Sequence, residues 1–349
     1  MKKHERTLLE HAKAQFAQNP TVRSVSLGYR YRGGKKTGEK CIVVGVVKKM
    51  AANKIDKSLI IPQKYHGVQT DVQDRDLKAI GIDIQTNPQS LTGKKRPCPG
   101  GFSIGHYKIT AGTLGAWVRY GTSDDYFVLS NNHVLAASND AMVNDEIYQP
   151  GPHDGGTSSD LFGRLEEWAK INFGDDEKKK LGKTAWKAWQ WPANALARAV
   201  GCPYRMRVST RAVEQPNPNL VDAAIARPLL QSYVDPTIWE DMEIAGIRDL
   251  VLGDRVQKTG RTTGHTVGTV EGIGAMVRVS YGGNKIATYD NQVEIRADSG
   301  EFSAGGDSGS VILTMEDEPY LGGLLFAGGS GVTISNRISD VVALMGVRL

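Results

Sequence analysis

The chain has 349 residues, a formal net charge of +5 and a hydrophobic content of 40%. Domains usually hold roughly 100–200 residues, so this length predicts two or three of them. The 40 glycines favour a globular, turn-rich and largely β protein. A nucleic-acid-binding protein would need clustered basic residues on one face, and this modest charge predicts no nucleic-acid partner.

The cysteines and the N-terminus indicate where the protein resides. Cys41, Cys98 and Cys202 are widely spaced and match neither a disulfide framework nor a metal site, which favours reduced thiols in the cytosol. The first residues lead into an amphipathic segment rather than a signal peptide. No apolar run approaches the roughly 20 residues of a membrane span. We therefore expect a cytoplasmic protein with no membrane partner, no metal and no cofactor.

Residues 1–83 predict a small α/β domain. Apolar residues recur at helical spacing over residues 5–18, and Asn19-Pro20 ends this helix. Two β-rich segments around a glycine turn predict a hairpin, and a third strand follows. The three expected strands are residues 22–31, 41–47 and 68–72. The domain could serve in assembly, in substrate presentation or simply as a cover for a barrel edge.

Residues 84–101 contain proline, glycine and a basic run, which predicts a linker. Strand patterns then continue over residues 102–240 and 241–349, with two separate strands expected at 266–273 and 275–281. Apolar residues at helical spacing predict a closing helix over 338–347. A tryptophan-rich segment near residues 166–203 interrupts them and predicts a helical insertion. That insertion could gate a site, contact another subunit or pack its tryptophans on the surface.

One glycine-dense turn, residues 305–310, enters an apolar strand and holds a candidate nucleophile, Ser308. Glycine permits positive φ and a close backbone approach, so peptide N–H groups can converge on one point and bind an oxyanion. A serine hydroxyl becomes nucleophilic when a neighbouring base takes its proton. The remaining sequence must therefore supply a histidine and an acid that orients it.

Among the seven histidines, His133 comes just after a strand pattern, separated from it by three small polar residues. Asp222 is a carboxylate in an otherwise apolar strand, and burial of such a group is costly unless it is paired. An imidazole N–H is a suitable partner. We therefore predict that His133, Asp222 and Ser308 form a base, an orienting acid and a nucleophile. By contrast, His153 beside Asp154 in a loop rich in glycine and proline predicts a turn rather than a metal site.

The chain order histidine, aspartate, serine is that of the chymotrypsin architecture. Together with the segments Leu129–Val134, Val221–Ala226 and Gly306–Ser310, this order resembles the trypsin/chymotrypsin-like serine peptidases over roughly residues 100–349. The N-terminal extension resembles the subgroup of plant narrow-leaf-type proteins and their bacterial relatives. The resemblance implies a mainly β fold with two six-stranded antiparallel barrels, the first over 102–240 and the second over 241–349. It also suggests a homo-oligomer.

The resemblance implies a serine endopeptidase that hydrolyses protein or peptide substrates through an acyl-enzyme. Gly306 and Ser308 would supply the oxyanion-hole N–H groups. Relatives are often activated by cleavage after a basic residue, but Pro97 follows Arg96 and does not fit that motif. We therefore expect the protein to be made active, with Asp307 satisfied by another partner.

The resemblance also places a substrate pocket around Phe302, six residues before the nucleophile, and around Phe326, Ala327 and Gly328. Phe302 is not acidic, so we expect a small or apolar residue before the cleaved bond rather than arginine or lysine. Phe326 replaces a serine that helps to hold the acid in relatives. The support of Asp222 therefore needs another source.

Two other functions remain open from the sequence. The chain could be a peptide-binding or assembly protein with an inactive or gated triad, or a hydrolase that acts on esters. Labelling of Ser308 by a fluorophosphonate separates the first alternative from an enzyme, and a comparison of ester with amide substrates separates the second.

Overall fold

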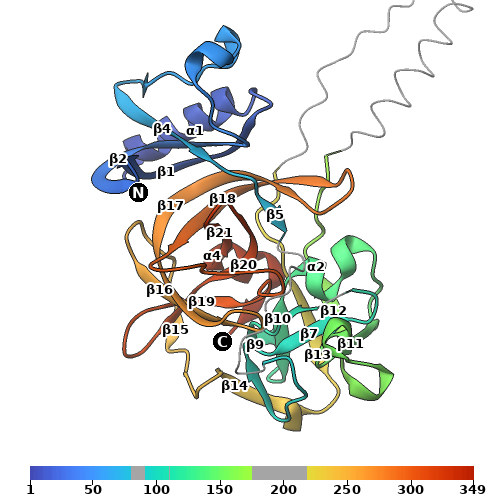
Figure 1. Cartoon of the computed structure of the whole chain (residues 1–349). Helices are drawn as coiled ribbons and strands as arrows, with labels where there is room; N and C mark the ends of the chain where they lie inside the picture. The colour runs from blue at the N-terminus through green and yellow to red at the C-terminus, as the bar shows by residue number, and fades with distance from the viewer. Residues whose placement is uncertain (80–90, 110, 175–217) are drawn as a thin grey trace, which may run out of the picture.

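The computed structural model describes residues 1–79, 91–109, 111–174 and 218–349, and it is mainly β, as expected (Figure 1). Among these residues, no helix combines the length and the apolar character needed to cross a membrane. The tryptophan-rich insertion predicted near residues 166–203 lies largely outside the described residues, as does Cys202. The strand that leads toward it is β12, Leu161–Trp168.

The N-terminal part contains the expected helix and strands. Helix α1 (Lys3–Phe16) packs its apolar face on a hairpin of β1 (Val22–Arg32) and β2 (Lys35–Val46), and β4 (Val68–Asp74) pairs parallel to β2. Strand β3 (Lys64–Tyr65) pairs with β4. The helical spacing and the hairpin pattern thus predicted these elements correctly.

This N-terminal sheet continues into the C-terminal half. Strand β1 pairs antiparallel with β17 (Gly264–Ser280), for example through Ser24 and Val277, and Figure 1 shows α1 and β1 beside β17. We expected two strands where the single long β17 runs. Its register shifts between Val270 and Val277, and Gly274 has a φ of +61°. Such bulges bend a strand without ending it.

Six strands of the C-terminal half close into a ring, because the pairing of β16 with β17 joins the two ends of the path. In ring order they are β16 (Arg255–Gly260), β19 (Val311–Thr314), β20 (Tyr320–Gly329), β21 (Val332–Arg337), β18 (Ile286–Ala297) and β17. Buried apolar residues from several of these strands, among them Val256, Val270, Ile295 and Leu325, pack together.

The second large sheet contains eight strands along an open path of pairings. Its order is β22 (Val347–Arg348), β9 (Ala116–Tyr120), β10 (Tyr126–Ser130), β13 (Ala224–Pro228), β12, β11 (Glu146–Tyr148), β7 (Ser103–His106) and β8 (Gly112–Thr113). The expected closure of this half into a six-stranded barrel is therefore not confirmed. The predicted closing helix is α4 (Ile338–Met345), and β22 after it returns the chain to this sheet.

Short elements complete the described chain. Strand β6 (Cys98–Gly100) lies within the expected linker, yet it is buried and pairs parallel with β14 (Val234–Ile238). Strands β5 (Lys78–Ala79) and β15 (Gly246–Ile247) attach to the C-terminal sheet. The remaining helices are α2 (Asn132–Leu135) and the 3₁₀ turns Ala52–Lys54, Lys57–Leu59, Ala137–Asn139, Pro152–Asp154, Ser158–Asp160 and Gln231–Tyr233.

Candidate active site

The turn between β18 and β19 holds Ser308, which is 1% exposed. Gly306 and Gly309 flank it with φ values of +94° and +96°, a conformation that side chains with a Cβ rarely adopt. A Cβ at Gly309 would overlap Ser130 and Thr113 of the other large sheet. These glycines are therefore required both for the bend of the turn and for its close packing between the two sheets.

The peptide groups that carry the N–H of Gly306 and of Ser308 are fixed through their carbonyl ends. The carbonyl before Gly306 accepts a hydrogen bond from Thr262 Oγ1 at 2.6 Å, and the carbonyl before Ser308 accepts one from the Ser310 N–H at 3.0 Å. In a trans peptide the N–H points away from the carbonyl. Both N–H groups are thus oriented by bonds on their far side.

His133 lies in the short helix α2 that follows β10, rather than directly at the strand end. Its Nδ1 is 2.6 Å from Asp222 Oδ2, and its backbone N–H donates to Asp222 Oδ1 at 3.2 Å. Because a carboxylate accepts hydrogen bonds, Nδ1 carries the proton in this pair. The predicted pairing of His133 with Asp222 is therefore present.

Asp222 is fully buried, but it lies just before β13 and not within a strand as expected. Its backbone explains the difference, because both of its polar groups bond to side chains instead of a neighbouring strand. The Asp222 N–H donates to Asn336 Oδ1 at 3.1 Å, and its carbonyl accepts from Asn131 Nδ2 at 2.7 Å. These two amides set the position of the carboxylate.

Tyr281 supports the Asp222 carboxylate from the C-terminal half of the chain. Its hydroxyl donates to Asp222 Oδ2 at 2.7 Å and lies 2.5 Å from the Tyr289 hydroxyl. Since its one proton goes to Asp222, Tyr289 must donate to Tyr281. Burial, and secondly the charge of Asp222, raise the pKa of Tyr281 well above its usual range, so the phenol stays protonated.

No local sequence signal identified Tyr281, because it follows a long strand and meets Asp222 only through the fold. Its ring also lies edge-on to the His133 imidazole, with 5.8 Å between the ring centroids. The phenol thus contacts both members of the pair.

Gly112 lies close both to Ser308 and to Val134, the residue after His133. A Cβ at Gly112 would lie 2.9 Å from the Ser308 carbonyl oxygen and would overlap Val134, the residue after His133. The Ser308 hydroxyl donates to the Phe326 carbonyl at 3.4 Å, and the buried Nε2 of His133 has no hydrogen-bond partner among the described residues. The pair with Asp222 is formed, whereas the structure records no hydrogen bond from Ser308 to that nitrogen.

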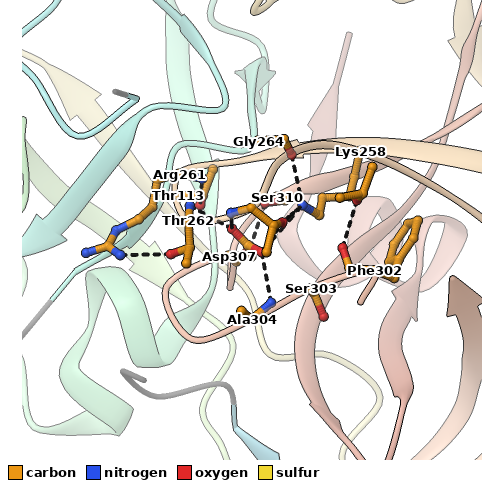
Figure 2. Close-up of polar contacts among 12 residues, drawn as sticks. Thr113, Lys258, Arg261, Thr262, Gly264, Phe302, Ser303, Ala304, Asp307 and Ser310 are labelled. Atoms are coloured by element: carbon orange, nitrogen blue, oxygen red, sulfur yellow. Dashed lines mark hydrogen bonds and ion pairs between the residues drawn. The ribbon is translucent and has the colours of Figure 1, made fainter. Parts of the chain in front are cut away.

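Asp307, next to the nucleophile, is held by an internal cation (Figure 2). Lys258 Nζ lies 3.4 Å from Asp307 Oδ2, and neither side chain is exposed. The carboxylate also accepts from the N–H of Thr262, Thr263 and Ala304 at 2.9, 3.2 and 3.0 Å, and from Thr263 Oγ1 at 2.6 Å. The sequence analysis expected another partner for Asp307. That partner is Lys258, together with the surrounding hydrogen-bond donors.

Burial of the Lys258 ammonium lowers its pKa, and the charge of Asp307 opposes that shift. Two further groups, Thr263 Oγ1 and the Gly264 carbonyl, receive hydrogen bonds from Nζ. A buried charge with so many partners is a fixed part of the structure, since breaking the pair leaves an isolated charge in the core.

A cleft of about 890 Å³ opens beside His133. Gly328, one of the predicted pocket residues, lines it. The other three are buried: Phe302 packs inside the closed ring, and Phe326 and Ala327 pack with a second apolar cluster. The side chain of Phe302 therefore fills the position where the resemblance placed the pocket base.

Strand β20 carries a second chain segment beside the cleft. Its Ala327 and Gly328 pair antiparallel with Ala79 and Lys78 of β5, and Lys78 also pairs parallel with Ser280 of β17. The structure thus shows that this part of β20 accepts an extended backbone.

The described residues include no group of three histidine, cysteine, aspartate or glutamate side chains that could hold a metal ion. Asp154, which is next to His153, instead forms an ion pair of 2.8 Å with Arg261. Cys41 and Cys98 are buried and free, and burial raises the pKa of each thiol to about 12.

No family model and no curated protein matches this chain. Three solved structures resemble it distantly, and each covers 72% of this chain. They are a glutamic acid-specific serine protease said to use a novel histidine triad in substrate binding (18% identity, TM-score 0.44, 98% of that chain), Thermobifida fusca protease A (15%, 0.43, 97%) and a Nocardiopsis protease (15%, 0.42, 97%). Because these similarities are distant, the function has to be argued from the site itself.

Proposed function

We propose that the protein is a serine endopeptidase that uses Ser308, His133 and Asp222. The observation that carries this proposal is the 2.6 Å contact between His133 and the buried Asp222, together with a glycine turn of positive φ that holds Ser308. A histidine oriented by an acid is what a serine hydroxyl needs as its base. The buried, unpartnered Nε2 of His133 supports the assignment of that atom as the base.

In the proposed reaction the Ser308 hydroxyl leaves the Phe326 carbonyl and donates to His133 Nε2. Its oxygen attacks the substrate carbonyl carbon while Nε2 takes the proton, and the same proton then passes to the leaving amine. Water hydrolyses the resulting ester by the same route, which regenerates the serine. Asp222 and Tyr281 hold the imidazole in the required tautomer throughout.

The N–H groups of Gly306 and Ser308 would bind the oxyanion of the tetrahedral intermediate. Their peptide planes are already fixed by Thr262 and Ser310, so little reorganisation is needed when the charge develops. The Lys258–Asp307 pair supports the same turn without any cleavage of the chain. We therefore propose that the protein needs no proteolytic activation.

The pairing of β20 with β5 supports a peptide as substrate, since a strand edge binds an extended chain through its main-chain groups. The buried Phe302 supports a small or apolar residue before the cleaved bond. We extend the proposal to a two-barrel fold of the chymotrypsin type, the narrow-leaf-type subgroup, a cytoplasmic location and a homo-oligomer. These last points follow from the sequence.

Covalent labelling by a fluorophosphonate, followed by cleavage-site profiling with a peptide library, tests the proposal. The parent should label at Ser308 and cleave peptide bonds, and Ser308→Ala should lower turnover by a factor on the order of 10⁶. The exposed, remote serine in Ser159→Ala is the matched control and should leave both measurements at parental values. Equal turnover by Ser308→Ala and the parent would overturn the assignment.

A peptide-binding protein is the second candidate, because the Ser308 hydroxyl bonds to Phe326 and β20 already carries a strand. Peptide binding without labelling of Ser308 would favour this function. An esterase would instead label and hydrolyse esters while leaving amides intact.

A further inference from the structure

The chain's own residues 76–79 lie along the strand edge beside the candidate active site. Strand β5 sits between two neighbours, because Lys78 pairs with Gly328 of β20 on one side and with Ser280 of β17 on the other. Figure 1 shows β5, in light blue, beside the β17 ribbon. Lys78, Ser280 and Gly328 line the same cleft as His133. The segment therefore occupies part of the space that a peptide would enter.

The backbone of this segment is closely docked. The Ser280 N–H donates to the Leu77 carbonyl at 3.2 Å, and the Asp76 N–H donates to Ser330 Oγ at 3.1 Å. Gly329 has a φ of +153°, and a Cβ at this position would overlap the Asp76 carbonyl. The absence of a side chain at Gly329 is thus required for the approach of the segment.

Leu77 anchors the segment through its side chain. It is 2% exposed and belongs to an apolar cluster with Tyr289, Phe326, Ala327 and Val332. Its neighbours in the segment are different, since the side chains of Asp76 and Lys78 are 57% and 66% exposed. Recognition of the segment therefore combines main-chain pairing with one apolar side chain, which is how strand edges select peptides.

We propose that residues Asp76–Ala79 are a built-in occupant of the peptide-binding edge formed by Ala327, Gly328 and Gly329. A substrate has to displace this segment, so the segment lowers the apparent affinity for peptides. The preferred peptide is extended and carries leucine, or a similar apolar side chain, where Leu77 lies. This inference rests on the proposed function for its role in catalysis, but peptide binding tests it separately.

The first test measures binding of a dye-labelled hexapeptide with the sequence of residues 74–79, by fluorescence anisotropy. Leu77→Asp places a charge in the apolar cluster and should release the segment, so the peptide should bind about tenfold more tightly than it binds the parent. Asp76→Asn changes an exposed side chain of the same segment and should bind like the parent. Equal binding by the parent and Leu77→Asp, or no binding by either, would overturn the proposal.

A second variant, with a reversible disulfide, tests the proposal without depending on the folding of Leu77→Asp. The paired residues Lys78 and Ser280 line the same cleft, so Lys78→Cys/Ser280→Cys should form a disulfide that holds β5 in place. The oxidised protein should bind the hexapeptide at least tenfold more weakly than the reduced protein, and unchanged binding would contradict the proposal. If binding responds as expected but Ser308 never reacts with a fluorophosphonate, the occupied edge stands and the peptidase function fails.

Discussion

Two aspartates of this molecule are equally buried but have very different partners. Asp222 and Asp307 both have 0% exposure. Asp222 accepts hydrogen bonds from an imidazole and a phenol that line the cleft. Asp307 is paired with the Lys258 ammonium and accepts hydrogen bonds from neutral donors. Burial alone therefore does not separate the carboxylate proposed for catalysis from one that supports the fold, whereas the partner does.

The difference follows from what each partner can do. An imidazole can gain or lose a proton near neutral pH, so a carboxylate beside it stabilises a charge that appears during a reaction. Lys258 does not line the cleft, and its pairing with the Asp307 carboxylate stabilises the fold instead. Changes at Asp222 should consequently affect the rate, and changes around Asp307 should affect the free energy of unfolding.

Between the two aspartates, the largest expected effect is the loss of rate in Asp222→Asn. The amide keeps the shape of the side chain but favours the wrong imidazole tautomer, so kcat should fall by a factor of about 10⁴. Steady-state kinetics on a cleaved peptide measures this. Urea unfolding should show a much smaller change in stability than for variants of the Lys258–Asp307 pair. A variant that lost stability while retaining kcat would contradict the comparison.

Lys258→Met is expected to act on stability. It leaves the Asp307 carboxylate buried without a cation, which should lower the free energy of unfolding by about 3–5 kcal/mol in urea titrations. Lys258→Met/Asp307→Asn removes both charges and should recover part of the loss, because the amide oxygen can still accept from the N–H groups of Thr262 and Thr263. A double variant as unstable as the single one would show that the ion pair is not the cause.

The sequence predicted the parts of the site that depend on local pattern. The sequence indicated the glycine turn at Ser308, the strand before His133 and the apolar surroundings of Asp222. The predicted pairing of His133 with Asp222 is present. The sequence also required a partner for Asp307. It could not identify Lys258, because a lysine within a strand of mixed polarity shows no sign of burial until the ring closes.

The same limit applies to contacts between distant segments. Tyr281 reaches Asp222, and β5 reaches β20, through pairings that span 59 and about 250 residues along the chain. The N-terminal hairpin was predicted, but its union with β17 was not, since strand patterns carry no information about which edge they join. The break predicted between residues 273 and 275 is absent, because β17 bends there through bulges and does not end.

Tyr281→Phe removes one hydrogen bond to Asp222 while leaving the carboxylate itself in place. Loss of one hydrogen bond to a charged group should lower kcat about tenfold, with KM nearly unchanged. A rise in KM as large as the fall in kcat would indicate a packing role alone. Tyr320→Phe, at a partly buried phenol that does not line the cleft, is the control.

The smallest expected effect is on stability at alkaline pH. Burial raises the pKa of Tyr281 well above the value near 10 that it has in the unfolded chain. Its contribution to stability is therefore complete below pH 10 and is lost as the pH rises, because the unfolded state releases the proton first. Between pH 9 and pH 10.5 this one group should cost about 0.8 kcal/mol, so Tyr281→Phe should lose that much less than the parent in urea titrations. Identical losses would show that the Tyr281 phenol titrates alike in the folded and unfolded states, and would remove it as a fixed donor to Asp222.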